Sequence, residues 1–190
     1  MVNVGFICEG ITEKTILDSA NFREILKKNA INVVGDVIDA EGNGNLLPEN
    51  VEDDQNKLFK VGADFILILT DLDNDACITR TKERIGSHEK QLIIVSVKQV
   101  EAWFLADSVT IGKLLGEDFN FELPESELLP FEKIRQIFME KTNRGVGTKA
   151  ILARRMIKYG FSLESAAKHP DCPSSKYFLN KLTKLNQVNS

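Results

Sequence analysis

The stretch from Asp64 to Asp71 constrains the fold of this chain more than any other part of the sequence. Between the two acids lies the run Phe-Ile-Leu-Ile-Leu-Thr, which is apolar up to its last residue. A run of this length without alternation is typical of a strand buried on both faces, as in parallel sheets covered by helices. The acids that follow, Asp73 and Asp75, are expected in the loop beyond this strand. The sequence therefore predicts carboxylates at one edge of a parallel sheet.

Strands and helices are expected to alternate through the first half of the chain. Further strands are predicted at 2–8, 32–40 and 92–97, and helices at 12–28, 46–59 and 76–85. Thr12 is the expected N-cap of the first helix, and Pro48 favours a late start for the second. Such alternation implies right-handed crossovers. We therefore predict a Rossmann-like α/β fold with a parallel four-stranded sheet and helices on both faces.

After residue 97 the pattern changes to helices. They are expected at 98–106, within 131–159 with a break at 143–147, and at 174–185, whereas 117–129 is acidic and irregular. Trp103, Phe104 and Leu105 are expected in the core. We divide the chain into an α/β domain, 1–107, and a helical C-terminal extension packed on it, 108–190.

Composition is that of an ordinary globular protein, with 43% apolar and 27% charged residues. The three cysteines, Cys8, Cys77 and Cys172, are far apart and form no C-x-x-C pair, which disfavours a disulfide framework or a thiolate zinc site. No signal-peptide pattern is present, and no apolar run approaches the roughly 20 residues that cross a bilayer. We expect a cytoplasmic protein without a membrane partner.

Charge is distributed unevenly along the chain. Residues 36–75 contain eleven acids and two lysines, whereas residues 133–158 contain eight Lys or Arg and one acid. One segment suits cations and the other suits anions. In the basic segment, a Gly-rich turn at 143–149 enters a helix without the spacing of a P-loop. We interpret its cations as contacts to nucleic-acid phosphates: Arg144, Lys149, Arg154 and Arg155. A solvated helix face that offsets the acids is an equally good interpretation.

Glu9 ends the first predicted strand, as Asp71 ends the strand at 64–71. Ligands of open parallel sheets bind beyond the carboxyl ends of strands. If these two strands are neighbours, Glu9 lies on one rim with Asp71 and Asp73, and an extended D-x-D points both aspartates the same way. Carboxylates about 4 Å apart repel by a few kcal/mol at an effective dielectric near 20 and favour a hard cation such as Mg²⁺ or Mn²⁺. The alternative is that individual acids cap the following helices.

Two motifs resemble those of Toprim domains. Cys8-Glu9-Gly10-Ile-Thr-Glu13, between a strand and a helix, resembles the Toprim Glu motif, and Thr70-Asp71-Leu72-Asp73 resembles the D-x-D motif. The similarity covers about residues 1–107, including the segment Glu101-Ala-Trp-Phe-Leu-Ala-Asp107. The chain resembles small bacterial Toprim-like proteins of uncharacterised function and the Toprim nuclease part of the overcoming-lysogenisation-defect family. The segment at 101–107 is similar to one that the small proteins carry after the fourth strand.

This resemblance implies metal-dependent hydrolysis of phosphodiester bonds in DNA or RNA, in bacterial defence or repair. Glu9 is then a general acid or base or a metal ligand, Asp71 and Asp73 hold Mg²⁺, and Glu13 serves a second metal. Asp75 either assists them or is simply solvated.

Lys98 and Glu101 are expected near the same rim. Lys98 is placed either to steady a phosphate or to form an i,i+3 surface pair with Glu101. Glu101 is an additional candidate metal ligand. A non-catalytic Toprim-like module that binds a nucleotide, nucleic acid or a partner protein is the alternative to a nuclease, and a homo-oligomer is compatible with both. Another phosphohydrolase is disfavoured because no D-x-D-x-T follows the first strand.

Overall fold

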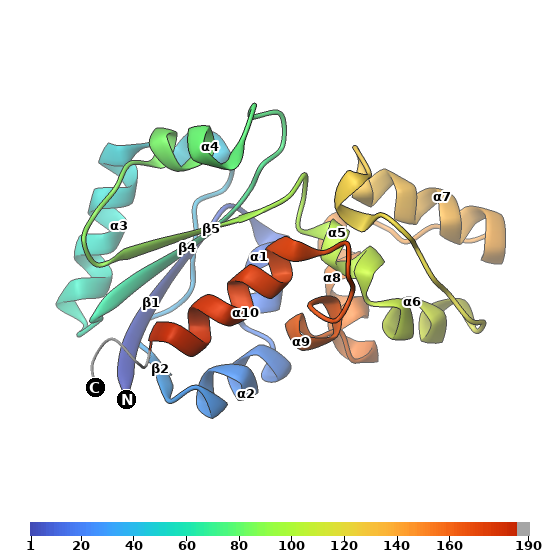
Figure 1. Ribbon diagram of the computed structural model, residues 1–190, viewed down its shortest axis with the longest axis horizontal. Helices are drawn as coiled ribbons and strands as arrows, with labels where there is room; N and C mark the ends of the chain where they lie inside the picture. The colour runs from blue at the N-terminus through green and yellow to red at the C-terminus, as the bar shows by residue number, and fades with distance from the viewer. Residues whose placement is uncertain (186–190) are drawn as a thin grey trace.

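The computed structural model of the protein describes residues 1–185, and its centre is a parallel β-sheet (Figure 1). The strands are β1 (Val2–Cys8), β2 (Ile31–Val33), β3 (Ile38–Asp39), β4 (Phe65–Asp71) and β5 (Gln91–Ser96). Their order is β2-β1-β4-β5, and β3 pairs with β1 further along the edge that β2 occupies. All pairings are parallel, so the predicted parallel α/β fold is confirmed.

Helices cover both faces of the sheet (Figure 1). The connections between strands contain α1 (Ile11–Leu17), α2 (Ala20–Lys28), α3 (Pro48–Lys60) and α4 (Ile78–Ile85). Strand β4 is buried on both faces of the sheet. Leu67 and Leu69 pack with α1 and α2 on one face, and Ile66 and Ile68 pack with α3 and α4 on the other. The chain changes face between β1 and β4, so these strands flank the switch point at which sheets of this kind bind ligands.

Two predicted elements are each divided in the structure. The expected strand at 32–40 is two short strands, β2 and β3, separated by a turn in which Gly35 has a φ of 69°. The expected helix at 12–28 is α1 and α2, and the Ser19 hydroxyl caps α2 by accepting a hydrogen bond from Phe22 N at 3.1 Å. The prediction that Thr12 is an N-cap is wrong, because Gly10 holds that position and Thr12 lies inside α1.

The rest of the described chain is helical. It contains α5 (Glu101–Ala106), α6 (Ser108–Leu115), α7 (Pro130–Thr142), α8 (Lys149–Tyr159), α9 (Leu163–Ala166) and α10 (Pro173–Leu185). Short 3-10 turns occur at Asn43–Asn45 and Pro124–Ser126. Helix α8 packs against α1, and α10 runs across the sheet beside β5 (Figure 1). None of the helices in residues 1–185 has both the length and the apolar character needed to span a membrane.

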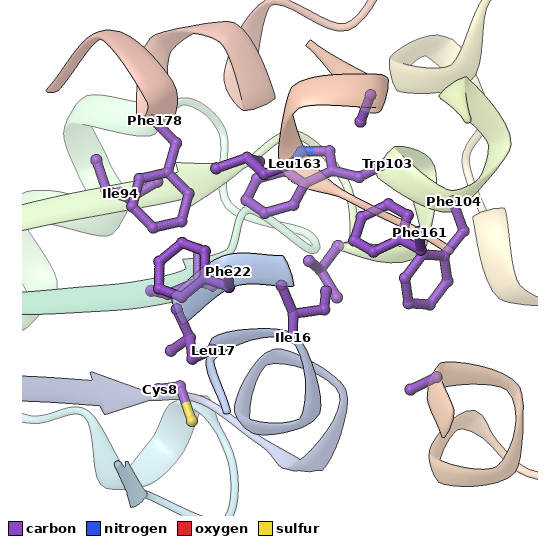
Figure 2. Close-up of a cluster of buried hydrophobic side chains, with 14 of the residues drawn as sticks. Cys8, Ile16, Leu17, Phe22, Ile94, Trp103, Phe104, Phe161, Leu163 and Phe178 are labelled. Atoms are coloured by element: carbon purple, nitrogen blue, oxygen red, sulfur yellow. The ribbon is translucent and has the colours of Figure 1, made fainter. Parts of the chain in front are cut away.

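One apolar core joins the sheet to the C-terminal helices (Figure 2). Trp103 of α5 and Phe22 of α2 both pack against Phe178 of α10, with ring centroids 6.0 and 5.6 Å from it. The Trp103 indole N–H donates to Ser174 Oγ at 2.7 Å, so its polar atom is satisfied. The predicted burial of Trp103, Phe104 and Leu105 is confirmed. This core fixes α5 and thereby Glu101, its first residue, against the end of the sheet.

Candidate functional site

Glu9 and Asp71 lie side by side beyond the central strands β1 and β4. The backbone N–H of Glu9 donates to Leu69 O at 3.0 Å, which extends the pairing of the two strands. The Glu9 carboxylate then turns toward β4, where its Oε2 accepts hydrogen bonds from Thr70 Oγ1 at 2.6 Å and Asp71 N at 3.0 Å. Burial raises the pKa of Glu9, while the bonds from Thr70 and Asp71 oppose this shift. The structure thus brings together two acids separated by 62 residues.

Asp71 is anchored by the end of β5. Its Oδ1 accepts from Ser96 Oγ at 2.5 Å and from the backbone N–H of Val100 at 2.8 Å. The residue is only 5% exposed. Burial, followed by the charges of Glu13 and Glu101, raises the pKa of Asp71 well above its ordinary value. Asp71 is therefore a rigidly positioned carboxyl group in strongly negative surroundings.

Glu13 lies one helical turn beyond Glu9 on α1 and is buried. Within residues 1–185, no other residue's side chain or backbone hydrogen-bonds to its carboxylate. Burial, followed by the charges of Glu101 and Glu9, raises the pKa of Glu13 to about 8. The surroundings of Glu13 therefore disfavour its charged form.

Glu101 enters the same region from α5 and is fully buried. Its Oε1 accepts from Thr12 Oγ1 at 3.1 Å, and its Oε2 pairs with Lys149 Nζ at 3.2 Å. The predicted surface pair between Lys98 and Glu101 is wrong, because tertiary packing buries Glu101 and supplies a different cation. We call Glu9, Glu13, Asp71 and Glu101 the acidic cluster.

Lys149 is the cation that faces the acidic cluster. Burial by itself lowers the pKa of this ammonium group, but the charges of Glu101 and Asp71 outweigh it and raise the pKa overall. Among the described residues, no other Lys or Arg forms an ion pair with a member of the cluster. Within residues 1–185, one ion-paired cation therefore serves four carboxyl groups, and the charge of Arg84 also lowers the pKa of Glu9.

Asp73 lies on the same rim but points elsewhere. Strand β4 ends at Asp71, and Asp73 has a φ of 45°, so the assumption of an extended D-x-D is wrong. Its carboxylate accepts from Asn43 Nδ2 at 3.3 Å and from Gln99 Nε2 at 3.5 Å. The charge of Asp73 nevertheless contributes to the raised pKa of Glu9. Asp73 therefore borders the acidic cluster instead of joining it.

Asp75 is held by the following helix. Its Oδ2 accepts from Thr81 Oγ1 at 2.9 Å and forms an ion pair with Arg84 at 3.3 Å. Arg84 also donates to Asn43 O at 2.9 Å, so one guanidinium joins two loops at the rim. These contacts give Asp75 and Arg84 a positioning role for the loop that carries Asp73.

Lys98 lies in the turn between β5 and α5. It adopts a φ of 63°, and its carbonyl accepts from Asp73 N at 2.8 Å. In the described chain, no ion pair links its ammonium group to a carboxylate. The expected helix at 98–106 begins only at Glu101.

The four basic residues predicted to contact phosphates are spread over α8 and the loop before it. Lys149 pairs with Glu101, Arg144 and Arg154 are exposed, and Arg155 lies over the Phe138 ring of α7 at 5.5 Å from its centroid. Only Lys149 therefore reaches the acidic cluster, and a shared role of all four in binding nucleic acid stays a prediction.

The donor atoms of the acidic cluster are carboxylate oxygens, the ligand type that hard cations such as Mg²⁺ take in proteins. In residues 1–185, no group of three or more Asp, Glu, His or Cys side chains is arranged so that it could hold a metal ion. Mg²⁺, however, commonly keeps several waters and takes only one or two carboxylates from the protein. Glu9 Oε1 and Asp71 Oδ2 accept no hydrogen bond from the described residues, and the nearby Glu13 carboxylate accepts none from any other residue among 1–185.

Several residues that shape the site were missed by sequence reasoning. Thr12, Thr70 and Ser96 donate hydrogen bonds to Glu101, Glu9 and Asp71. Thr70 could have been found from the sequence, because it is a polar residue at the end of an apolar strand, directly before Asp71. Thr12 and Ser96 could not, because their partners come from tertiary packing.

Comparison with known proteins adds no assignment to this geometry. No protein-family model matches the chain, no curated protein matches it, and no solved structure matches it.

Proposed function

We propose that the acidic cluster binds a divalent cation, Mg²⁺ or Mn²⁺, and that the protein hydrolyses phosphodiester bonds in DNA or RNA. The observation that carries this proposal is the charge balance at the end of β1 and β4. In the described chain, four carboxyl groups, three of them buried, share one ion-paired ammonium group, with the charge of Arg84 acting on Glu9 as well. Burial and mutual repulsion raise the pKa values of Glu9, Glu13 and Asp71. Such a group either retains protons or recruits a cation.

Glu9 and Asp71 are the ligands that the geometry favours. Each is fixed through one carboxylate oxygen, which leaves Glu9 Oε1 and Asp71 Oδ2 without a hydrogen bond from the described residues. Glu13 neighbours both acids and is suited to a second cation or to proton transfer, because its pKa of about 8 lies near neutrality. When bound, Mg²⁺ or Mn²⁺ supplies Lewis-acid stabilisation of phosphate charge and activation of water.

Lys149 is suited to the phosphate of the substrate. Its ammonium is partly exposed while it pairs with the buried Glu101, and its raised pKa keeps it charged. A positive group next to carboxylates stabilises negative charge that develops on a phosphoryl oxygen. Arg144 and Arg154, exposed near and along α8, extend this positive surface for a nucleic-acid backbone.

The test compares wild type with Glu9→Gln and Asp71→Asn. Each protein is incubated with supercoiled plasmid, single-stranded DNA and RNA in Mg²⁺, Mn²⁺ or EDTA. We expect cleavage by wild type in the presence of metal and a loss of about 100-fold or more in either variant. Glu52→Gln, an exposed acid on α3, is the matched control and should cleave like wild type.

Isothermal titration with Mn²⁺ separates binding from catalysis. Glu9→Gln and Asp71→Asn should bind Mn²⁺ at least about tenfold more weakly than wild type, and circular dichroism shows whether each variant is folded. Folded wild type that binds neither Mg²⁺ nor Mn²⁺ would disprove the proposed metal site.

A non-catalytic binding module is favoured by one observation, the ion pair between Lys149 and Glu101. In this alternative the lysine permanently supplies the positive charge, and the rim binds a nucleotide, a nucleic acid or a partner protein. It predicts nucleic-acid or nucleotide binding that persists in EDTA and in Glu9→Gln, without cleavage.

A further inference from the structure

Strand β5 presents a free edge on the side of the sheet that faces away from β4. It is the last strand of the sheet and pairs with β4 alone. Ile66 N donates to Lys90 O and Leu72 N donates to Ser96 O, so the even-numbered residues of this segment face β4. By the alternation of a parallel ladder, Ile93 and Val95 direct their N–H and C=O groups to the open side. This edge has the hydrogen-bonding groups that an added strand needs.

Two hollows follow this edge. One, of about 360 Å³, is lined by Ile78 and Lys82 of α4, by Val95 of β5 and by Tyr177 of α10, among others. The other, of about 540 Å³, also includes Lys82 and continues past Ile93. We call the two together the edge groove. It lies between α4 and α10, which cover opposite faces of the sheet at β5 (Figure 1).

The edge groove has an apolar floor and a positive border. Ile78 and Tyr177 are 40% and 39% exposed, which is high for side chains of this kind. The ammonium groups of Lys82 and Lys181 lie 5.4 and 5.2 Å from the Tyr177 ring centroid. Neither lysine forms an ion pair with any residue in the described part of the chain. Two cations that form no ion pair within residues 1–185 thus flank an exposed aromatic ring beside free backbone groups, while Glu83, which also lines the groove, pairs with Arg80.

We propose that the edge groove binds an extended, acidic segment of a partner polypeptide, which adds to the sheet as a strand beside β5. Backbone hydrogen bonds to Ile93 and Val95 supply affinity, and alternate apolar side chains contact Ile78 and Tyr177. Carboxylates on the partner meet Lys82 and Lys181, which supplies the selectivity.

Charge argues against a second copy of this chain as the occupant. Two-fold pairing of β5 with itself places Lys82 and Lys181 of both copies along the same groove. Like charges opposed in this way cost several kcal/mol. The same two lysines that oppose self-association attract an acidic strand.

The test uses fluorescein-labelled peptides and the full chain. The probe is an alternating peptide, Glu-Val-Glu-Val-Glu-Val, compared with its Lys-for-Glu counterpart and with an acidic peptide of equal charge that contains a central proline. Fluorescence anisotropy measures affinity, and amide hydrogen exchange measures protection at Ile93 and Val95. We expect the acidic peptide to bind wild type at least about tenfold more tightly than either comparison peptide and to slow exchange at Ile93 and Val95.

The double variant Lys82→Glu/Lys181→Glu should weaken acidic-peptide binding at least about tenfold. Lys27→Glu/Lys60→Glu, which changes two exposed lysines on other helices by the same charge, should bind like wild type. The proposal is overturned if wild type shows no preference for the acidic peptide, or if binding leaves exchange at Ile93 and Val95 unchanged. It is also overturned if sedimentation shows a wild-type dimer that protects these amides. The wild-type comparison holds even if a lysine variant folds poorly.

Discussion

Lys149 Nζ lies 3.2 Å from Glu101 Oε2, although 48 residues separate the two. Glu101 begins α5 and is fully buried, whereas the Lys149 side chain at the start of α8 remains 39% exposed. The pair therefore connects the interior of the acidic cluster with the surface. It also makes the C-terminal helices part of the site, since α8 supplies the cation and packs against α1, which carries Glu13.

Replacement of Lys149 by Met is expected to destabilise the protein by about 2 kcal/mol. The change leaves the buried Glu101 without its cation, and the partial exposure of Lys149 places the cost below that of a fully buried pair. Urea unfolding in EDTA measures this cost. Lys158→Met, an exposed position on the same helix, is the control and should change stability by less than about 0.5 kcal/mol.

A double-mutant cycle with Glu101→Gln isolates the pair. If the ion pair operates as described, Glu101→Gln/Lys149→Met loses less stability than the sum of the single changes. Strict additivity would show that the two side chains act independently.

Glu13 is expected to contribute to the pH dependence of stability, together with Glu9 and Asp71, whose pKa values are also raised. The pKa of Glu13 is about 8 in the folded protein, against an ordinary value of 4.5. Because the folded state binds the proton more tightly, this group's contribution is complete below about pH 4.5 and is lost as the pH rises through about 8. In EDTA, the free energy of unfolding should fall across this window, by at most about 1.4 kcal/mol per pH unit for one proton.

Glu13→Gln should flatten this fall, since the amide does not titrate. Urea unfolding at a series of pH values measures the slope, and Glu52→Gln is the control with an unchanged slope. A Glu13→Gln profile parallel to that of wild type would assign the pH dependence to another group.

Much of the fold follows from local sequence, because a long apolar run and strand–helix alternation fix a parallel sheet without knowledge of distant contacts. The nearness of Glu9 and Asp71 follows from the same logic, since neighbouring parallel strands end at one rim. The division of 32–40 into β2 and β3 depends on Gly35, whose φ of 69° the sequence permits but does not require.

The composition of the acidic cluster depends on tertiary packing, so the sequence predicts it less completely than it predicts the fold. Helical spacing alone suggested that Lys98 and Glu101 form a surface pair. The aromatic core around Trp103 instead buries α5, and Glu101 takes partners from α1 and α8. Asp73 was expected to point with Asp71, but the chain turns directly after β4 and directs it to Asn43.

Thr70→Val is expected to raise the pKa of Glu9. The Thr70 hydroxyl donates to Glu9 Oε2 at 2.6 Å and stabilises the charged carboxylate. Valine keeps the shape of the fully buried side chain but removes the donor. Carboxyl-carbon NMR titration in EDTA follows Glu9 directly. Thr142→Val, which removes a hydroxyl bonded to the backbone of α7, should leave the Glu9 titration unchanged, and an unchanged value in Thr70→Val would rule out this control of the Glu9 charge.

Arg84→Ala is expected to loosen the rim of the site while leaving the fold intact. Arg84 pairs with Asp75 and donates to Asn43 O at 2.9 Å, and Asn43 in turn donates to Asp73. Both members of the ion pair are about one-third exposed, so the loss of stability should be near 1 kcal/mol or less.

Amide hydrogen exchange at residues 43–45 should become faster in Arg84→Ala, because the loop loses its contact with α4. Arg80→Ala, which removes an exposed pair with Glu83 on the same helix, is the matched control. If the acidic cluster binds metal as proposed, Arg84→Ala should also weaken Mn²⁺ binding several-fold through Asp73. Exchange at 43–45 that stays as slow as in wild type would show that Arg84 does not hold the two loops together.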